Sequence, residues 1–427
     1  MNDTSRTGGS KELRRIARRV LPAGGFGNVA DDIVIARGEG GRVWDADGNR
    51  YIDYLLGSGP MLVGHAHPDV RAAIEAQLAM GTTFFTDSGP GILLAEAIAG
   101  AVPCADQVRF VSSGSEADAY AMRLARAFRR RDKILKFEGG YHGMSDWGLM
   151  SIWPKQQGNA VTALPDSAGI PAVLRDCMLV APFNDLDAVE RLVREHHDDL
   201  AGVMVEPFQR VIPPVPGFLE GLRELTARYE IPLIFDEVVT GFRFAYGGAQ
   251  AYYGVTPDIC TLGKVIGGGL PLAAIAGRAD IMAHFDKQAV GEAGFVPQVG
   301  TLSGNPMAAA AGLATLEVLR RPGTYDALFA TGRRLMEGLA GALANAGVPA
   351  VVTGVPPMFD VVFADVAIRN YRDTLAGDAE RTAAFNAALR KAGILKNKGK
   401  FYVSTAHDED DVRQTLAVFR EAAAALT

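Results

Sequence analysis

Five short apolar segments, separated by helical patterns, constrain the fold more than any other feature of the sequence. The segments are QVRFV (107–111), KILKF (133–137), GVMVE (202–206), IPLIFDE (231–237) and PDICTL (257–262). Alternating strand and helix patterns are typical of helices packed on a mostly parallel sheet, so we predict an α/β fold. Such sheets bind ligands at the carboxyl ends of their strands, so the polar residues after each strand are candidate site residues.

The two ends of the chain carry patterns that lie outside this sheet. Short strand patterns around turns at 39–41 and 47–49 predict a small meander, and helical spacing predicts helices over 68–80 and 92–101. A long Ala-rich helix pattern from about Ala308, followed by VVTGV, FDVVFA and KFYVSTA, predicts a smaller α+β domain. We expect an N-terminal segment (1–58) that packs with the small domain, a large cofactor-binding domain (59–310) and a small C-terminal domain (311–427).

Charge and cysteine usage exclude several classes of function. The 427-residue chain has a formal net charge of −6 and no long run of like charge, so neither nucleic acid nor a membrane is an expected partner. The three cysteines, Cys104, Cys177 and Cys260, lack the paired spacing of a zinc site or a disulfide framework. No stretch reaches about 18 consecutive apolar residues. We therefore expect a cytoplasmic protein that acts on small molecules and holds no metal.

The run Ser112-Ser113-Gly114-Ser115-Glu116 lies between a predicted strand and a predicted helix. Ser113 and Glu116 have the spacing of a capping box, and Gly114 would let the backbone approach an anion at the helix N-terminus. A phosphate group would fit this position. Taken alone, the motif is better explained by an ordinary capped helix start, so the phosphate site needs support from elsewhere in the chain.

That support comes from Asp236 and Lys264, each of which follows a predicted strand. Neighbouring strand–helix units bring an acid and an amine to one edge of the sheet. The pair suits pyridoxal phosphate, because a lysine amine can bond to its aldehyde and a carboxylate can keep its ring nitrogen protonated. A structural aspartate and a solvated lysine are the plainer alternative, which the apolar flanks of both residues weaken.

A further turn, Glu138-Gly139-Gly140-Tyr141-His142-Gly143, follows the strand KILKF. An aromatic ring in this position could stack on a planar cofactor, and Tyr141 is the candidate. A tyrosine that merely packs in a turn is the alternative. For His142, a structural role and a role near the cofactor are both open.

Four motifs together resemble the class III aminotransferases, of the aspartate aminotransferase fold type (fold type I). They are SSGSEADAYAMRLARA, FEGGYHGMSDW, IFDEVVTGFRFAYGGAQAYYGVTPDICTLGKVIGGGLP and GTLSGNPMAAAAG. The resemblance runs from about Pro22 to the end of the chain. It is closest to the glutamate-1-semialdehyde aminomutase branch of the family.

The resemblance implies a role for several residues. Lys264 would bind pyridoxal 5′-phosphate covalently, Asp236 would partner its ring nitrogen, and Tyr141 and Val238 would pack on its ring. Ser113, Gly114 and Ser115 would hold its phosphate, and Glu206 and His142 would lie near the cofactor. Thr301 would reach the phosphate from the neighbouring subunit, which implies a homodimer with shared active sites.

Two departures separate the chain from the aminomutases. The segment PAGGFGNVADDIVIARG is short and lacks the arginine that holds the substrate carboxylate there, and Lys398-Gly399-Lys400 stands where that branch has a glutamate. The segment NAVTALPDSAGIP, in contrast, resembles the mobile loop over the aminomutase site. Carboxylate-binding candidates for this chain are Arg210, Arg243, Lys396 and Lys398, each of which could equally be a surface charge.

We expect an aminotransferase that moves an amino group from an amine donor to a carbonyl acceptor in two half-reactions. An aminomutase-like isomerase is the nearest alternative. A nicotinamide-dependent dehydrogenase is less well supported, because no GxGxxG motif opens a helix after a strand. A non-catalytic cofactor-binding protein would need neither Lys264 nor Asp236.

Overall fold

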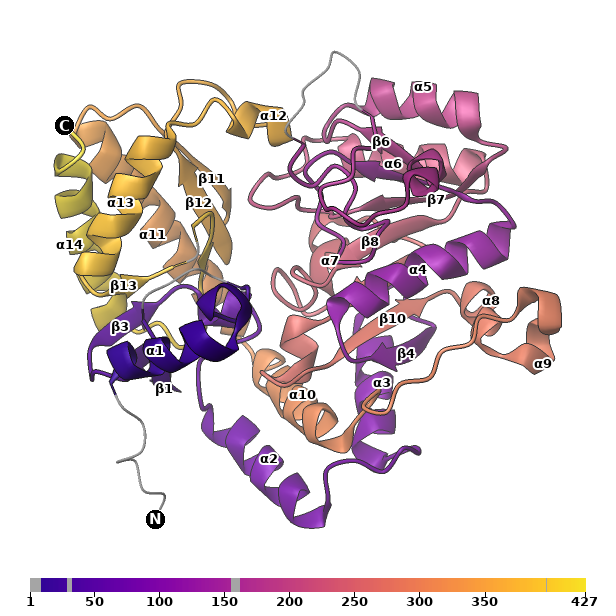
Figure 1. The fold of residues 1–427 in the computed structure, drawn as a ribbon, viewed down its shortest axis with the longest axis horizontal. Coiled ribbons are helices and arrows are strands. Elements are labelled where there is room, and N and C mark those ends of the chain that lie inside the picture. The colour runs from indigo at the N-terminus through magenta and orange to yellow at the C-terminus, as the bar shows by residue number, and fades with distance from the viewer. Residues whose placement is uncertain (1–8, 29–32, 155–161, 397) are drawn as a thin grey trace.

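A seven-stranded, mostly parallel sheet forms the centre of the molecule (Figure 1). The computed structural model describes residues 9–28, 33–154, 162–396 and 398–427. In spatial order the strands are β4 (Gln107–Val111), β10 (Ala273–Gly277), β9 (Ile259–Leu262), β8 (Leu233–Glu237), β7 (Leu200–Val205), β5 (Lys133–Phe137) and β6 (Met178–Ala181). Strands β9, β8, β7, β5 and β6 pair in parallel, whereas β10 is antiparallel to both of its neighbours. The predicted α/β class is confirmed.

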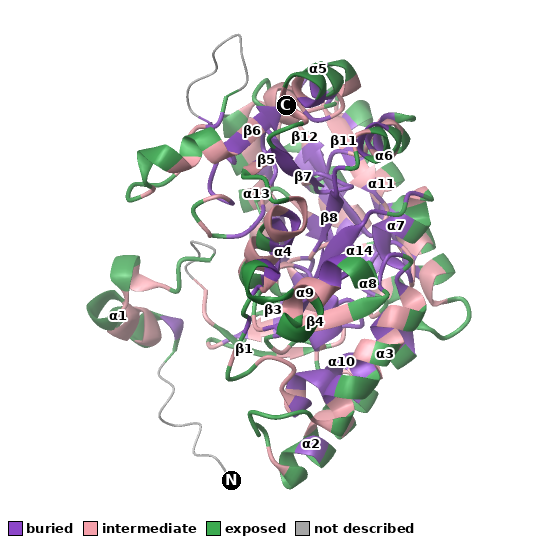
Figure 2. Cartoon of the chain, turned by 90° about the vertical axis from the view of Figure 1, so that its right-hand side faces the viewer, coloured by how far each residue is buried: buried purple, intermediate pink, exposed green. Residues whose placement is uncertain are grey.

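Successive residues of these strands pack into two separate cores, one on each face of the sheet. Leu233 and Phe235 of β8 join one core, and Ile234 between them joins the other. This follows from the period of two in a strand, which sends neighbouring side chains to opposite faces. Figure 2 shows the central strands buried and the outer helix surfaces exposed. Because both faces are covered, the strands are apolar along their whole length.

The helices follow the predicted alternation. Helix α4 (Gly114–Arg129) and the short α8 (Ala279–Met282) pack on one face of the sheet, and α5 (Leu186–His196) and α6 (Phe218–Arg228) pack on the other. The remaining helices of this part are α2 (Pro68–Met80), α3 (Gly89–Ala101), α7 (Gly248–Tyr253), α9 (Lys287–Val290) and α10 (Pro306–Leu319). Within the described ranges, no helix is long and apolar enough to cross a membrane.

The five predicted strands of the large sheet are all present, with boundaries shifted by up to two residues. Strands β6 and β10 were not predicted. The β10 sequence AAIAG lacks the β-branched and aromatic residues that mark most strands, and it is ordered by pairing with β4 and β9 on its two sides.

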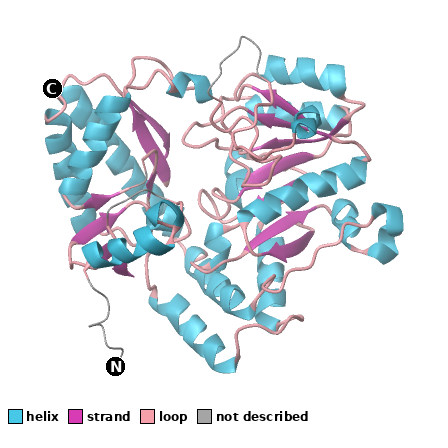
Figure 3. Ribbon diagram, viewed as in Figure 1, coloured by secondary structure: helices cyan, strands magenta, loops and turns pink. Residues whose placement is uncertain are grey.

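Two smaller sheets lie beside the large one (Figure 3). The N-terminal strands β1 (Ile35–Glu39), β2 (Arg42–Asp45) and β3 (Arg50–Asp53) form the predicted antiparallel meander, and β13 (Ile394–Leu395) adds in parallel to β3. The third sheet consists of β11 (Val351–Val355), β12 (Met358–Val362) and β14 (Phe401–Tyr402). Residues from the two ends of the chain therefore share one sheet. The domain boundaries at 58 and 310 remain a prediction.

Five helices accompany the smaller sheets. They are α1 (Ser10–Val20), α11 (Thr324–Asn345), α12 (Tyr371–Thr374), α13 (Ala379–Lys391) and α14 (Glu409–Ala424). Helices α11 and α14 pack against each other, and Phe385 of α13 and Phe419 of α14 meet Phe401 and Phe363 in a common aromatic cluster. Aromatic pairs of this kind stabilise a core beyond the area that they bury.

An ion pair connects the large sheet to the C-terminal part of the chain. Glu138, directly after β5, accepts hydrogen bonds from Arg372 of α12 at 2.7 Å (Nε) and 3.1 Å (Nη2). The glutamate side chain is 5% exposed and the arginine side chain 30% exposed. A bidentate, partly buried pair of this geometry contributes more than a solvent-exposed one.

We predict that Glu138→Gln lowers the free energy of unfolding by about 1.5–3 kcal/mol, because the buried end of a charge-assisted pair loses its charge. Urea unfolding followed by circular dichroism measures the change. Glu317→Gln is the matched control, since Glu317 pairs with Arg320 across an exposed helix surface and should cost less than about 1 kcal/mol. Equal losses in both variants would contradict a special contribution from the Glu138 pair.

Candidate active site

A cavity of about 390 Å³ opens at the carboxyl ends of β7, β8 and β9. The parallel order of these strands brings residues that are far apart in sequence to one edge of the sheet. Eight residues singled out in the sequence line the cavity: Ser113, Gly114, Ser115, Tyr141, Glu206, Asp236, Val238 and Lys264. The structure therefore brings together most of the predicted cofactor contacts. It places His142, Thr301, Arg210, Arg243 and Lys398 outside the cavity lining.

Asp236, the next-to-last residue of β8, presents a buried carboxylate with three polar neighbours. The ring nitrogen Nδ1 of His142 lies 2.8 Å from Asp236 Oδ2. The Val238 amide donates to Oδ1 at 3.1 Å, and the Thr261 hydroxyl lies 3.4 Å from the same oxygen. These contacts fix the orientation of the carboxylate. His142 is itself buried, so it acts on the cavity through Asp236 and not by lining it.

Asp118, which was not predicted from the sequence, is a second buried carboxyl group in the cavity wall. Thr261 Oγ1 lies 2.7 Å from Asp118 Oδ1 and 3.4 Å from Asp236 Oδ1, so the hydroxyl bridges the two carboxyl groups. Burial, together with the charge of Asp236, raises the pKa of Asp118 well above its usual value. A neutral Asp118 avoids placing two negative charges side by side. The available signal was an acidic residue within the apolar stripe of α4, beside the buried Ala117 and Ala121.

Lys264 extends into the cavity from the turn after β9. It begins the 3₁₀ turn Lys264–Gly267 with a left-handed backbone (φ 48°), which is uncommon for a residue with a side chain. Its amine forms no hydrogen bond with any described residue, and burial lowers its pKa. A lower pKa increases the neutral fraction of the amine, which is the nucleophilic form.

The N-terminus of α4 forms the anion-binding end of the cavity. Ser113 Oγ accepts the Glu116 amide at 3.3 Å, and the Glu116 carboxylate accepts the Ser112 amide at 2.7 Å. The bond from the Glu116 amide to Ser113 is the predicted one, whereas the Glu116 carboxylate accepts the amide of Ser112 and not that of Ser113. Within the described chain the amides of Gly114 and Ser115 have no acceptor, so they and the helix dipole remain available to an anion.

Gly114 leaves room for the side chain of Val238 as well as for an anion. A Cβ at this position would lie 2.8 Å from Val238 Cγ1. From the sequence alone, close approach of a phosphate is the role expected for this glycine. In the structure it also lets α4 approach the turn after β8, which keeps Val238 in the cavity wall.

Tyr141 is held by its main chain. Its amide donates to Glu206 Oε2 at 3.0 Å. Glu206, directly after β7, thereby connects this strand to the turn at 138–143 that carries Tyr141 (the tyrosine turn). Lys136, buried within β5, donates to the carbonyls of Gly140 (3.0 Å), Gly148 (3.2 Å) and Met150. Burial lowers the pKa of Lys136 to about 7. This lysine, also missed from the sequence, fixes the turn that carries Tyr141; its signal was a charged residue inside an apolar strand.

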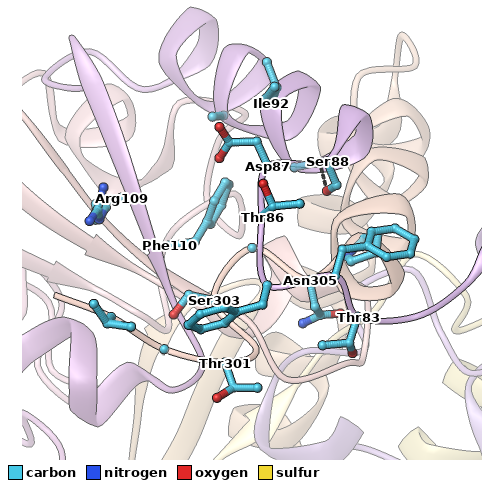
Figure 4. A pocket seen from close by; sticks show the side chains of 18 of the residues that line it. Thr83, Thr86, Asp87, Ser88, Ile92, Arg109, Phe110, Thr301, Ser303 and Asn305 are labelled. Atoms are coloured by element: carbon cyan, nitrogen blue, oxygen red, sulfur yellow. Dashed lines mark hydrogen bonds between the residues drawn. The ribbon is translucent and has the colours of Figure 1, made fainter.

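Thr301 lies in a second cavity, apart from Lys264. Figure 4 shows Thr301 with Thr83, Ser303 and Asn305 around this cavity, which also measures about 390 Å³. Within a single chain Thr301 therefore does not reach the first cavity.

Three of the four carboxylate-binding candidates are engaged elsewhere or point to solvent. Arg243 is fully buried and donates to the carbonyls of Gly59 and Val403. Lys396 pairs with Asp360 at 3.0 Å, and Lys398 is exposed. Lys400, which was not a candidate, acts on Lys264: burial lowers the Lys264 pKa, and the charge of Lys400 lowers it further. The Lys400 amine lies 5.9 Å from the ring centre of Tyr402.

The segment NAVTALPDSAGIP (159–171) is described only from residue 162 onward, and residues 29–32 of the shortened N-terminal segment also lie outside the described residues. Residue 162 and those after it pack beside the tyrosine turn. Ser151 donates through Oγ to the Thr162 carbonyl at 2.8 Å, and the Ile152 amide donates to Asp166.

The donor set fits pyridoxal phosphate. The cavity combines unpaired amides at a helix N-terminus for a phosphate, an oriented carboxylate for a ring nitrogen and an unpaired amine for an aldehyde. Among the described residues, no group of His, Cys, Asp and Glu is arranged to hold a metal ion.

A family model and several solved structures match most of the chain. The aminotransferase class-III family model matches residues 26–413. An omega-transaminase from Sphaerobacter thermophilus is 36% identical, with 99% of each chain covered and a TM-score of 0.92. A β-phenylalanine aminotransferase from Variovorax paradoxus is 31% identical over 96% of this chain and 93% of its own, with a TM-score of 0.86.

A glutamate-1-semialdehyde aminomutase from Pseudomonas aeruginosa is also similar, at 28% identity over 98% of this chain and 94% of its own, with a TM-score of 0.86. The fold, the cofactor and the type of reaction expected from the sequence are confirmed by these matches. The chain belongs to the class III aminotransferase family and is a transaminase that depends on pyridoxal 5′-phosphate.

Proposed function

We propose that this transaminase moves an amino group between an amine or amino acid and a keto or aldehyde acceptor, with Lys264 and Asp236 as its catalytic residues. One observation carries the proposal: an unpaired amine of lowered pKa shares a cavity with an oriented, buried carboxylate. Groups with perturbed pKa values in a cleft are candidates for chemistry. A protein that only bound the cofactor would need neither group.

In this proposal each residue has a separate task. Pyridoxal phosphate, when bound, supplies an aldehyde and an electron-withdrawing ring. Lys264 would hold the cofactor and, once displaced by the donor, move a proton at the substrate carbon that carries the nitrogen. Asp236 would hold a proton on the ring nitrogen, kept in place by His142 and Thr261.

The other predicted contacts position the cofactor. The Gly114 and Ser115 amides would bind its phosphate, and Tyr141 and Val238 would pack against its ring. Glu206 would orient Tyr141 through the main-chain hydrogen bond. The apolar side chains of Leu270 and Leu272 in the cavity lining would limit access of water.

An isomerase is the competing function within the family. The similarity to an aminomutase supports it, while the missing N-terminal arginine and the Lys398-Gly399-Lys400 segment speak against it. An isomerase keeps donor and acceptor in one molecule, whereas a transaminase needs two substrates.

We predict that the purified holoenzyme turns over an added amino donor continuously only when a carbonyl acceptor is present. With the donor alone it should consume only an amount equal to its active sites and lose the visible absorbance of its cofactor. Lys264→Ala should retain the cofactor without a covalent bond and show neither reaction, because the nucleophile and the base are the same group. Isomerisation of glutamate 1-semialdehyde without any donor, and no transfer to an acceptor, would assign the chain to the aminomutases instead.

Asp236→Asn keeps the shape of the side chain and removes its charge. A charge-assisted hydrogen bond in a buried site contributes about 1.5–3 kcal/mol, so kcat should fall roughly ten- to a hundredfold. Cofactor content, measured on the same preparation, separates lost chemistry from lost binding. Unchanged turnover at full cofactor loading would remove Asp236 from the mechanism.

We further propose a cytoplasmic homodimer whose active sites are shared. Apolar side chains near Thr301 are exposed on the single chain, among them Phe84, Phe85 and Val299, at 50%, 68% and 79%. Exposed apolar groups that surround a cavity are typical of a protein interface. A partner chain on this surface would bring its Thr301 toward the phosphate site of the first chain. The three free cysteines agree with a reducing compartment.

We predict that Thr301→Ala weakens cofactor retention more than it changes kcat, because a hydroxyl that bonds a phosphate acts on binding. The decisive sample is a heterodimer of Thr301→Ala and Lys264→Ala chains, isolated through two different tags. If the contact crosses subunits, one site carries both lesions and the other is intact, so half of the sites should show wild-type cofactor affinity.

Activity at limiting cofactor measures this fraction, and the two homodimeric variants are the controls. If the contact lay within one chain, every site of the heterodimer would carry one lesion. Absence of any site with wild-type cofactor affinity would therefore rule out the shared site.

A further inference from the structure

Arg210 occupies a turn position that normally favours glycine. The amides and carbonyls of Gln209 and Ile212 bond to each other at 3.1 and 2.9 Å, so Arg210 and Val211 form a two-residue turn shortly after β7. Arg210 has a left-handed backbone with φ 63°. A long side chain in this conformation carries a cost that glycine avoids, and such outliers gather at functional sites.

The guanidinium group is fixed at one edge and unpaired at the other. Nε donates to the Gly139 carbonyl at 2.9 Å. The Cζ atom lies 5.5 Å from the ring centre of Tyr141 and 5.6 Å from that of Trp153, so the group is placed between two aromatic rings beside the cavity wall. Its Nη2 atom is buried without a hydrogen-bond partner in the described structure.

A buried hydrogen-bond donor on a charged group is costly when it has no acceptor. Such a donor calls for an explanation, and a bound ligand that accepts its hydrogen bond is one. The chain around Arg210 supplies no carboxylate to the group: no ion pair joins it to a described acidic side chain. Glu206, an acid of the cavity lining, already accepts the Tyr141 amide. A planar, oriented guanidinium with a vacant donor edge matches a carboxylate, which it can bind through two parallel hydrogen bonds.

Arg210 differs from the other cations in the edge that it leaves vacant. Arg243 also has a buried Nε without a described partner, but both of its terminal nitrogens donate to main-chain carbonyls, those of Gly59 and Val403, and Lys396 is neutralised by Asp360. Only Arg210 of the four candidates combines an unpaired buried donor with contact to a residue of the cavity lining, Tyr141.

We propose that Arg210 binds the carboxylate of the substrate, so that the enzyme prefers amino acids and keto acids to amines and ketones without a carboxylate. This inference rests on the proposed function and names its substrate class. The carboxylate would be held on the Tyr141 side of the cavity, with the Gly139 carbonyl fixing the direction of the guanidinium. The arginine at this turn would take the place of the N-terminal arginine that the chain lacks.

The test compares matched donors in the first half-reaction of the holoenzyme. The pairs are alanine with isopropylamine, β-alanine with propylamine, and 4-aminobutanoate with butylamine; in each pair a methyl group replaces the carboxylate. We expect the wild type to favour at least one amino acid over its partner amine, and Arg210→Gly to reduce that preference at least tenfold through a higher KM. Arg191→Gln, on the exposed surface of α5, is the control and should keep the preference.

Glycine is the informative replacement because it suits the left-handed backbone of the turn. Arg210→Gly should melt no lower than the wild type, which separates loss of selectivity from loss of folding. Arg210→Gln, which keeps a polar side chain without the charge, should lose the same preference. Preference retained in both variants, or amines and amino acids weakened equally, would overturn the proposal.

A second measurement needs no turnover. Butanoate carries the carboxylate and cannot react, and isothermal titration into the holoenzyme measures its dissociation constant. We expect this constant to rise at least tenfold in Arg210→Gly and to stay unchanged in Arg191→Gln. Equal butanoate binding by the wild type and Arg210→Gly would reject Arg210 as the carboxylate-binding residue. If Arg210→Gly lost butanoate binding but the wild type reacted with no donor, only the proposed function would be rejected.

Discussion

The buried carboxylate of Asp236 is the group around which this site is organised. A charge at the end of a central strand, covered on both faces of the sheet, is costly unless its oxygens are satisfied. The structure satisfies them with a histidine nitrogen, a main-chain amide and a hydroxyl, which come from three separate segments. The side chain of Asp236 therefore connects three segments: the tyrosine turn, the turn after β8 and strand β9. The same threonine also bonds Asp118, so a second acid is drawn into the arrangement.

The sequence was informative wherever position along a parallel sheet decides geometry. Asp236 and Lys264 could be placed in one crevice because the carboxyl ends of parallel strands meet at one edge, whatever their separation in sequence. The apolar strands were recognisable for the same reason, since burial on both faces leaves few polar residues in them. The strand β10 was not recognisable, because Ala273 to Gly277 carry little strand propensity and are ordered by their neighbours. The short edge strand β6 offers too few residues to show a period.

The site residues that escaped the sequence have a common cause. Asp118, Lys136 and Lys400 act on groups contributed by other elements, and their own flanking residues do not reveal those partners. The residues around Lys136 in β5 do not indicate its partners, yet its amine donates to main-chain carbonyls as far along the chain as that of Met150. The backbone of Arg210 is equally invisible in the sequence, since an arginine between glutamine and valine gives no sign of a left-handed turn. Contacts of this type depend on how elements pack, and the family resemblance transfers only those residues that the matched motifs contain.

The pairing of β13 with β3 has a consequence for how the chain is made. Ile394 lies beside Ile52, so roughly 340 residues separate two partners of one small sheet. Ribosomes add about 5–20 residues per second, which leaves the edge of β3 without its partner for some tens of seconds. The large sheet needs nothing beyond β10 and can close first, while the N-terminal meander waits for almost the whole chain to emerge. Premature truncation near the C-terminus would thus expose an open strand edge at the opposite end of the sequence, the feature through which partly synthesised chains aggregate.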